Sequence, residues 1–106
     1  MNFKTNLIKK IDKKKIIIGV IGLGYVGLPL SILFAKKRFQ ILGFDKDLKK
    51  IKSLNNKQSY ISRIKNFEIE ILKKNGEFTN DFDKISRCDV IIICVPTPLK
   101  NKNIPD

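Results

Sequence analysis

The chain has 106 residues, a length that suits one small domain and not two. Its composition, 42% hydrophobic and 30% charged, excludes a wholly disordered chain. The formal net charge of +12 would suit a polyanionic partner, but nearly all of the basic residues are lysines scattered along the chain. This pattern favours a solvated surface over base-specific reading of nucleic acid, which prefers arginine.

Cysteine and histidine usage excludes several kinds of site. The chain has no histidine, and its two cysteines, Cys88 and Cys94, form no C-x-x-C pair, so we expect no metal site. One possible pair also argues against a disulfide framework and indicates a reducing, cytoplasmic setting. Cys94 lies in a run of apolar β-formers, where a thiol packs as a small hydrophobe.

The first segment of the chain, residues 1–14, places Phe3, Leu7 and Ile11 at the spacing of one helix face. We expect a short amphipathic helix there, as an extension ahead of the first strand. Such a helix could pack on the domain or lie on a partner, and a membrane-surface role is the less favoured alternative.

An uncharged run of twenty residues, 16–35, has two interpretations. Its length and lysine-rich flanks suit a membrane span or imitate a signal peptide, although no small-residue cleavage site follows. Glycines crowd its first half, and glycine is costly inside a helix. We therefore favour a buried strand at 15–21, a glycine turn at 22–27 and a helix at 26–37. The apolar residues at helical spacing in that helix are Val26, Leu30, Leu33 and Phe34.

The remainder of the chain continues the alternation of strands and helices. A second strand at 39–45 completes a strand–turn–helix–strand unit, and its arrival favours the non-membrane interpretation. A helix at about 64–74 should turn Phe67, Ile71 and Leu72 inward. The other expected elements are a helix at 48–54, a loop at 55–63, an edge strand at most at 77–82, a helical turn at 83–89 and a fully buried strand at 89–95.

These elements predict an α/β fold with a Rossmann-type doubly wound parallel sheet. Right-handed crossovers give four strands the spatial order 3-2-1-4. In such sheets ligands bind beyond the carboxyl ends of the strands, where the strand order reverses. The turn at 22–27 and the segment 96–98, which follows the fourth strand, should therefore face one crevice.

Gly22, Gly24 and Gly27 form the pattern G-x-G-x-x-G between a strand and a helix. That context favours a dinucleotide-binding turn. The first glycine permits the tight turn, the second lets a pyrophosphate approach the backbone, and the third lets the helix lie close to the strand. The helix N-terminus then offers N–H groups to the phosphates.

Asp45 ends the second strand, 18 residues after Gly27. A carboxylate at this place can accept hydrogen bonds from both hydroxyls of an adenosine ribose and would repel a 2′-phosphate, which favours NAD over NADP. Lys46, Lys49 and Lys50 weaken this preference, because a lysine can accommodate the extra phosphate. The alternative is that Asp45 only caps the next helix.

Together, the motifs G-L-G-Y-V-G-L-P and C-V-P-T-P-L resemble the N-terminal NAD-binding domain of the UDP-glucose/GDP-mannose dehydrogenases, from about residue 14 onward. The segments QSYI and FTNDF look most like the branch that oxidises UDP-N-acetylglucosamine or related UDP-N-acetylhexosamines. The resemblance implies oxidation of a C6 alcohol to a uronic acid in two hydride transfers to NAD, for surface polysaccharides. It also implies a UDP-sugar substrate and a homo-oligomeric full-length form. The scattered lysines and the glycine-broken apolar run lead us to expect no nucleic-acid or membrane partner.

The resemblance also carries the family's cofactor contacts onto this chain. It adds Tyr25 and Val26 to the turn, and Lys50 to the ribose contacts of Asp45. It places Val95, Pro96 and Thr97 on the opposite wall of the crevice. The implied cofactor-binding set is Gly22, Gly24, Tyr25, Val26, Gly27, Asp45, Lys50, Val95, Pro96 and Thr97.

The chain also departs from the family pattern. The family's catalytic cysteine belongs to a glycine-rich motif that neither Cys88 nor Cys94 matches, so no residue here is assigned a catalytic role. We expect residues 15–106 to be a truncated NAD-binding Rossmann domain without the connector and UDP-sugar domain, inactive alone and exposing an apolar sheet edge. The alternatives are a stand-alone dinucleotide-binding module without catalysis and, on net charge alone, a basic nucleic-acid-binding protein.

Overall fold

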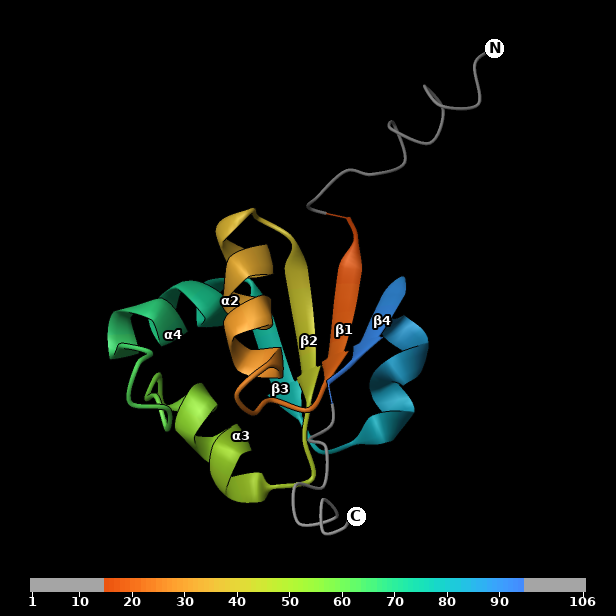
Figure 1. Ribbon diagram of the computed structural model, residues 1–106. Coiled ribbons are helices and arrows are strands. Elements are labelled where there is room, and N and C mark those ends of the chain that lie inside the picture. The colour runs from red at the N-terminus through yellow and green to blue at the C-terminus, as the bar shows by residue number, and fades with distance from the viewer. Residues whose placement is uncertain (1–14, 95–106) are drawn as a thin grey trace, which may run out of the picture.

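The structure is a computed structural model that describes residues 15–94. The helix expected at 1–14 lies outside the described residues. A four-stranded sheet forms the centre, with all neighbouring strands parallel and in the order β3-β2-β1-β4, which confirms the predicted fold class and order (Figure 1). The strands are β1 (Ile17–Ile21), β2 (Gln40–Phe44), β3 (Gly76–Thr79) and β4 (Val90–Ile93).

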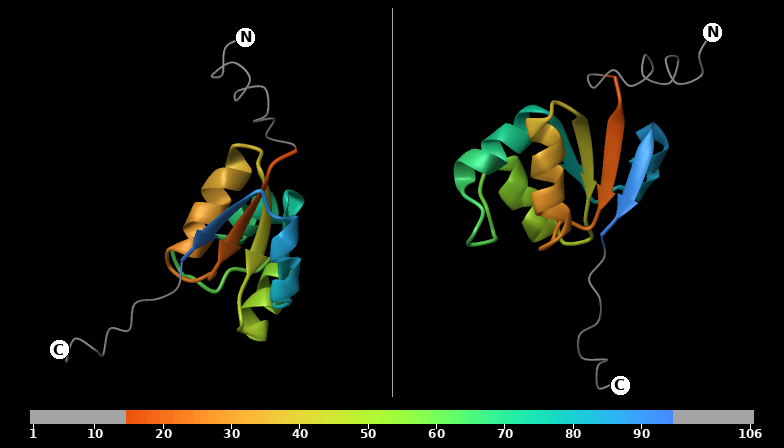
Figure 2. Two further views of the ribbon diagram at one scale, coloured as in Figure 1. Left: turned by 90° about the vertical axis from the view of Figure 1, so that its right-hand side faces the viewer. Right: turned by 45° about the horizontal axis from the view of Figure 1, so that its top comes forward.

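Helices cover the sheet on both sides. The helices are α2 (Gly27–Lys36), α3 (Leu48–Asn55) and α4 (Asn66–Lys74), together with the 3₁₀ turn η1 (Phe82–Arg87). Figure 2 shows α2 and η1 on opposite sides of the sheet, as the change of crossover direction after β3 requires. The helix expected from residue 64 begins at Asn66, because Lys65 is extended and its N–H donates to the Glu68 carboxylate over 3.1 Å.

The uncharged run of twenty residues contains β1, the glycine turn and all of the ten-residue α2 except its last residue, Lys36. Along residues 15–94, no helix has both the length and the apolar character needed to span a bilayer. The core consists of apolar side chains from β1 and β2 packed against those of the three helices.

The buried stripe of α2 differs from the spacing predicted by its largest side chains. Val26 and Leu33 are exposed, and Leu30 and Phe34 are only partly buried. Small residues permit a close approach to the sheet, so the helix turns its glycine, serine and alanine inward with two aliphatic residues. The buried members are Gly27, Leu28, Ser31, Ile32 and Ala35.

The inward face predicted for α4 is wrong at its first position. Phe67 is 61% exposed, whereas Ile69 is fully buried beside Leu72, and Ile71 is intermediate. The helix packs against α2 and β3, and that contact selects the face through Ile69 and Leu72. Hydrophobicity alone could not show on which side of α4 its neighbours lie.

The expectation of a fully buried fourth strand is also wrong. Val90, Ile91 and Ile93 of β4 are 45%, 44% and 66% exposed. Within the described residues β4 pairs only with β1, so it forms one edge of the sheet. The described part of the chain therefore presents apolar side chains at this edge, as expected.

Candidate functional site

The turn between β1 and α2 lies at the carboxyl end of the sheet (Figure 1). Gly22 has φ 97°, a left-handed conformation that glycine adopts without the strain that a Cβ would bring. Its N–H donates to the Phe44 carbonyl over 2.7 Å, which ties the start of the turn to the end of β2.

The other two glycines meet different surroundings. A Cβ on Gly27 would lie 1.7 Å from the Gly22 carbonyl oxygen, so only glycine allows α2 to begin this close to the turn. A Cβ on Gly24 would meet only the flexible end of Lys50, with Nζ at 3.8 Å. The backbone at Gly24 therefore faces open space, as a turn that admits a pyrophosphate requires.

The N-terminus of α2 opens toward the same space. Val26 is its N-cap and, within the described part of the chain, provides no side-chain cap. The Leu28 N–H donates to the Gly24 carbonyl over 3.0 Å and Pro29 has no N–H, so the attraction of this end for anions comes from the helix dipole and from the N–H groups that precede Leu28. Phosphate oxygens are the groups that such an end binds.

Asp45 holds the turn against the start of the next helix. Its Oδ2 accepts from the Leu23 N–H and its Oδ1 from the Asp47 N–H, each over 2.9 Å. The N-cap of α3 is Asp47, whose side chain accepts from the Lys49 N–H, so the alternative role of Asp45 as that cap is wrong. A carboxylate has about four acceptor positions, which leaves capacity on Asp45 for two ribose hydroxyls.

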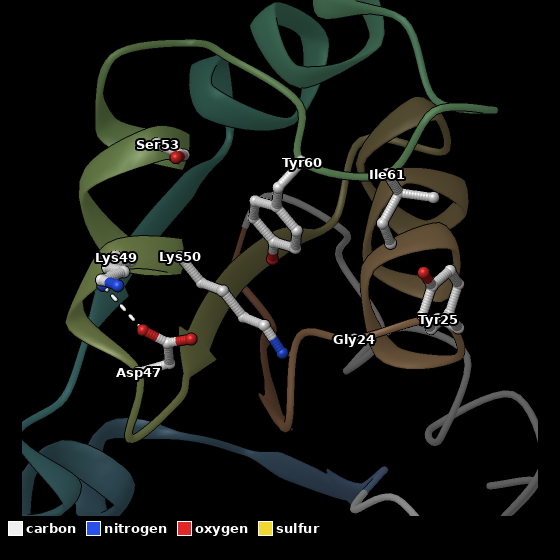
Figure 3. Close-up of a pocket in the computed structure, with 8 residues that line it drawn as sticks. All are labelled: Gly24, Tyr25, Asp47, Lys49, Lys50, Ser53, Tyr60 and Ile61. Carbon is white, nitrogen blue, oxygen red and sulfur yellow. Dashed lines mark hydrogen bonds between the residues drawn. The ribbon is translucent and has the colours of Figure 1, made fainter.

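Lys50 stands beside this carboxylate. Its Nζ lies 3.9 Å from Asp45 Oδ2 and 5.8 Å from the centre of the Tyr60 ring. Its side chain extends from α3 toward Gly24 (Figure 3). The ammonium is therefore near the part of the turn that has room for a phosphate.

Tyr60 reaches the turn from the loop between α3 and α4. Its hydroxyl donates to the Leu23 carbonyl over 2.5 Å. Burial, and after it the Asp45 and Asp47 carboxylates, raise the pKa of the Tyr60 phenol. The hydroxyl therefore stays protonated, and remains a donor, throughout the neutral range.

Two neighbouring cavities have Gly24, Tyr25 and Lys50 in both of their linings. The larger, about 700 Å³, lies over the carboxyl ends of β1 and β2; the smaller, about 280 Å³, lies between the turn and α3 (Figure 3). The larger is lined by Ile21, Gly22, Gly24, Tyr25, Val26, Phe44, Asp45, Lys46, Lys50, Phe82 and Cys94.

The structure brings most of the predicted cofactor residues together. All of the predicted residues from the turn line the larger cavity except Gly27, which is buried behind it, and Asp45 and Lys50 join them. Val95, Pro96 and Thr97 lie outside the described residues. Within those described, the sequence predicted no role at the site for Tyr60, Phe82 or Cys94, because only the folded chain brings them to this crevice.

The arrangement fits a dinucleotide, and it does not favour a reactive thiolate at Cys88. The open backbone at Gly24, the helix end and the Asp45 carboxylate match a pyrophosphate and its adjoining ribose. Cys88 packs against β1, where burial raises the pKa of its thiol in spite of the opposing charge of Arg87, which disfavours the reactive thiolate. Residues 15–94 contain no group of three or more side chains that could hold a metal ion.

Comparison with known proteins agrees with the geometry of a dinucleotide site. The model of the NAD binding domain of the UDP-glucose/GDP-mannose dehydrogenase family matches residues 15–106. The UDP-N-acetyl-D-glucosamine 6-dehydrogenase of Salmonella typhi is 42% identical over 97 residues, which are 91% of this chain and 22% of that protein. Protein CapL of Staphylococcus aureus is 38% identical over 89 residues, 84% of this chain and 20% of CapL.

A solved structure shares the architecture. The NDP-N-acetyl-D-galactosaminuronic acid dehydrogenase from Methanosarcina mazei Go1 superposes with a TM-score of 0.70 at 32% identity, over 92% of this chain and 23% of that one. The chain thus spans about a fifth of the length of the curated relatives that it matches.

Proposed function

The chain belongs to the UDP-glucose/GDP-mannose dehydrogenase family, and from that premise we propose that residues 15–106 provide the NAD site of a nucleotide-sugar 6-dehydrogenase. When bound, NAD would accept hydride from the sugar alcohol. The observation that carries the proposal is the Asp45 carboxylate, placed beside the open backbone of Gly24 at the α2 N-terminus.

Different residues of the chain would bind the pyrophosphate and the adenosine ribose of the cofactor. The turn at Gly22, Gly24 and Gly27 and the start of α2 would receive the pyrophosphate. Asp45 would accept from the adenosine ribose hydroxyls, and Lys50, 3.9 Å from it, would supply a compensating positive charge. Tyr25 and Val26 line the cavity beside the turn, and the resemblance adds Val95, Pro96 and Thr97 as the opposite wall.

The substrate proposed for the whole enzyme is a UDP-N-acetylhexosamine, oxidised at C6 to the uronic acid. The support is the 42% identity to a UDP-N-acetyl-D-glucosamine 6-dehydrogenase, together with the 32% identity to a dehydrogenase named for an N-acetylgalactosaminuronic acid. We also propose a cytoplasmic setting, a homo-oligomeric full-length form, and products that enter surface polysaccharides. The catalytic cysteine would come from outside these 106 residues, so this chain alone should bind NAD without turnover.

Calorimetry of the 106-residue chain with NAD tests the cofactor site. We expect binding, and Asp45→Ala should weaken it roughly tenfold or more, because both the ribose acceptor and the bond to the Leu23 N–H are lost. Glu70→Ala is the matched control, since it removes the same charge from an exposed position on α4. Absence of heat with the unchanged chain, or equal affinity for the Asp45 and Glu70 variants, would contradict the proposal.

A further inference from the structure

The peptide groups on either side of Leu23 are held by two side chains from different parts of the chain. The Leu23 N–H donates to Asp45 at the end of β2, and the Leu23 carbonyl accepts from the Tyr60 hydroxyl over 2.5 Å. Leu23 itself is fully buried, and it lies between Gly22 and Gly24 of the glycine turn. Hydrogen bonds with two distant side chains therefore fix the backbone at the centre of the turn, and we call this pair of bonds the Leu23 clamp.

Tyr60 is itself fixed in place. On its amino side, the Ser59 N–H donates to Asn66 Oδ1 over 2.8 Å, at the first residue of α4. On its carboxyl side, Ile61 is buried in the core, and its N–H donates to the Ser59 hydroxyl over 3.1 Å. The loop therefore holds the phenol at a set position relative to the turn.

The Leu23 clamp lies next to Gly24, where the backbone would bind the pyrophosphate. Leu23 precedes Gly24, the residue at which the backbone faces open space, and the Gly24 carbonyl accepts from the Leu28 N–H of α2 over 3.0 Å. Without the Tyr60 bond, the buried Leu23 carbonyl would lack that donor, and Leu23 would be held only through its N–H, by Asp45. A turn that is more mobile without ligand loses more conformational entropy when a ligand binds, and this lowers the affinity.

We propose that Tyr60 is a positioning residue of the cofactor site, which sets the glycine turn through the Leu23 carbonyl so that Gly24 and the start of α2 face the pyrophosphate. The inference rests on the proposed NAD site and extends it to the loop between α3 and α4. Tyr60 acts through the backbone of the turn and has no assigned contact with the cofactor.

Tyr60→Phe removes the hydroxyl and keeps the ring next to Lys50. The control is Asn75→Ala, which likewise removes a half-buried side-chain donor to a backbone carbonyl. Asn75 Nδ2 donates to the Ala35 carbonyl over 3.2 Å, at the end of α2 that lies away from the glycine turn. Three quantities are measured on the 106-residue chain: NAD affinity, hydrogen exchange of backbone amides without ligand, and the free energy of unfolding in urea.

We expect Tyr60→Phe to weaken NAD binding about threefold to tenfold, the ratio that one net hydrogen bond represents. In the ligand-free variant the Leu23 amide should exchange several times faster, and the exchange of the Ile69 and Leu72 amides of α4 should increase by a smaller factor. Asn75→Ala should lower stability but keep NAD affinity within about twofold.

Two results would overturn the inference. One is NAD affinity and Leu23 exchange that Tyr60→Phe leaves unchanged; the other is an equal loss of affinity in Asn75→Ala, which would reduce Tyr60 to a contributor to stability. If the unchanged chain binds no NAD, the proposed function fails by itself. The Leu23 exchange rate, which needs no cofactor, still decides whether Tyr60 sets the turn.

Discussion

Gly27 passes so close to Gly22 that a Cβ on Gly27 would lie 1.7 Å from the Gly22 carbonyl oxygen. The obstacle is backbone, which cannot rotate away as a side chain can. The start of α2 is therefore in direct backbone contact with the first residue of the glycine turn. Gly24, two residues after Gly22, has no such neighbour and faces the cavity.

Alanine substitutions at Gly27 and Gly24 should have different effects, the first on stability and the second on NAD affinity. Gly27→Ala should lower the free energy of unfolding by about 3 kcal/mol or more, because α2 must move away from the sheet. Gly24→Ala should change stability by less than about 1 kcal/mol but weaken NAD binding roughly tenfold, since its methyl group occupies the approach of the pyrophosphate. Urea unfolding and calorimetry measure both. A reversed order of the two effects would contradict the assigned roles.

Asp45 should determine the choice between NAD and NADP. A 2′-phosphate would lie against its carboxylate, whereas the nearby Lys46, Lys49 and Lys50 would attract that phosphate. We expect NAD to bind at least about tenfold more tightly than NADP, and Asp45→Asn to narrow this ratio while retaining an acceptor for the Leu23 N–H. Dissociation constants for both cofactors test this. Glu70→Gln is the control, and a ratio unaltered by Asp45→Asn would argue against the carboxylate as the selector.

Stability at high pH should depend on Tyr60. Its pKa is raised in the folded chain by burial and by the Asp45 and Asp47 carboxylates, so the folded state holds the phenolic proton more tightly than the unfolded state. This contribution is fully present below the unfolded pKa of about 10 and is lost as the pH rises toward the higher folded pKa. Urea unfolding between about pH 9 and 12 should show a steeper loss for the unchanged chain than for Tyr60→Phe. Parallel profiles would be inconsistent with a buried, protonated hydroxyl.

Gly19 of β1 and Cys88 should behave as a coupled pair. A Cβ on Gly19 would lie 2.5 Å from Cys88 Sγ, so Gly19→Ala should cost about 1–3 kcal/mol of stability. In a Cys88→Ala background the sulfur is gone, and the same substitution should cost at least about 0.5 kcal/mol less. Cys94→Ala is the control background, in which the full cost should remain. If the stability losses of Gly19→Ala and Cys88→Ala simply add in the double variant, the strain at Gly19 does not come from the Cys88 sulfur.

The exposed edge strand should make the chain self-associate. Val90 and Ile91 on β4 present apolar surface at a sheet edge, which is a template for pairing with another strand. Ile91→Lys should therefore raise the monomer fraction in sedimentation experiments without changing NAD affinity. Phe67→Lys, which charges an exposed apolar residue on α4, is the control. An equal gain from both variants would assign the effect to net charge and not to the edge.

The local pattern of the chain was enough to predict much of this molecule. The β-branched run of β1, the three spaced glycines and the acid ending β2 indicated a strand–turn–helix–strand unit, and the family resemblance agrees with the matched family model. Strand order followed from the handedness of crossovers. These features depend on neighbours in sequence or on rules that hold for all such sheets, so sequence alone was sufficient.

Burial and long-range contacts were decided only by the tertiary structure. Phe67 is exposed and Ile69 buried because the position of α2 selects the face of α4, and β4 is exposed because it pairs on one side alone within the described residues. The bond from Tyr60 to Leu23 joins residues 37 positions apart. Local sequence patterns were sufficient to predict the strand–turn–helix–strand unit and the turn that suits a dinucleotide. Only packing in three dimensions decided which side chains support that turn, since no periodicity encodes a contact between distant segments.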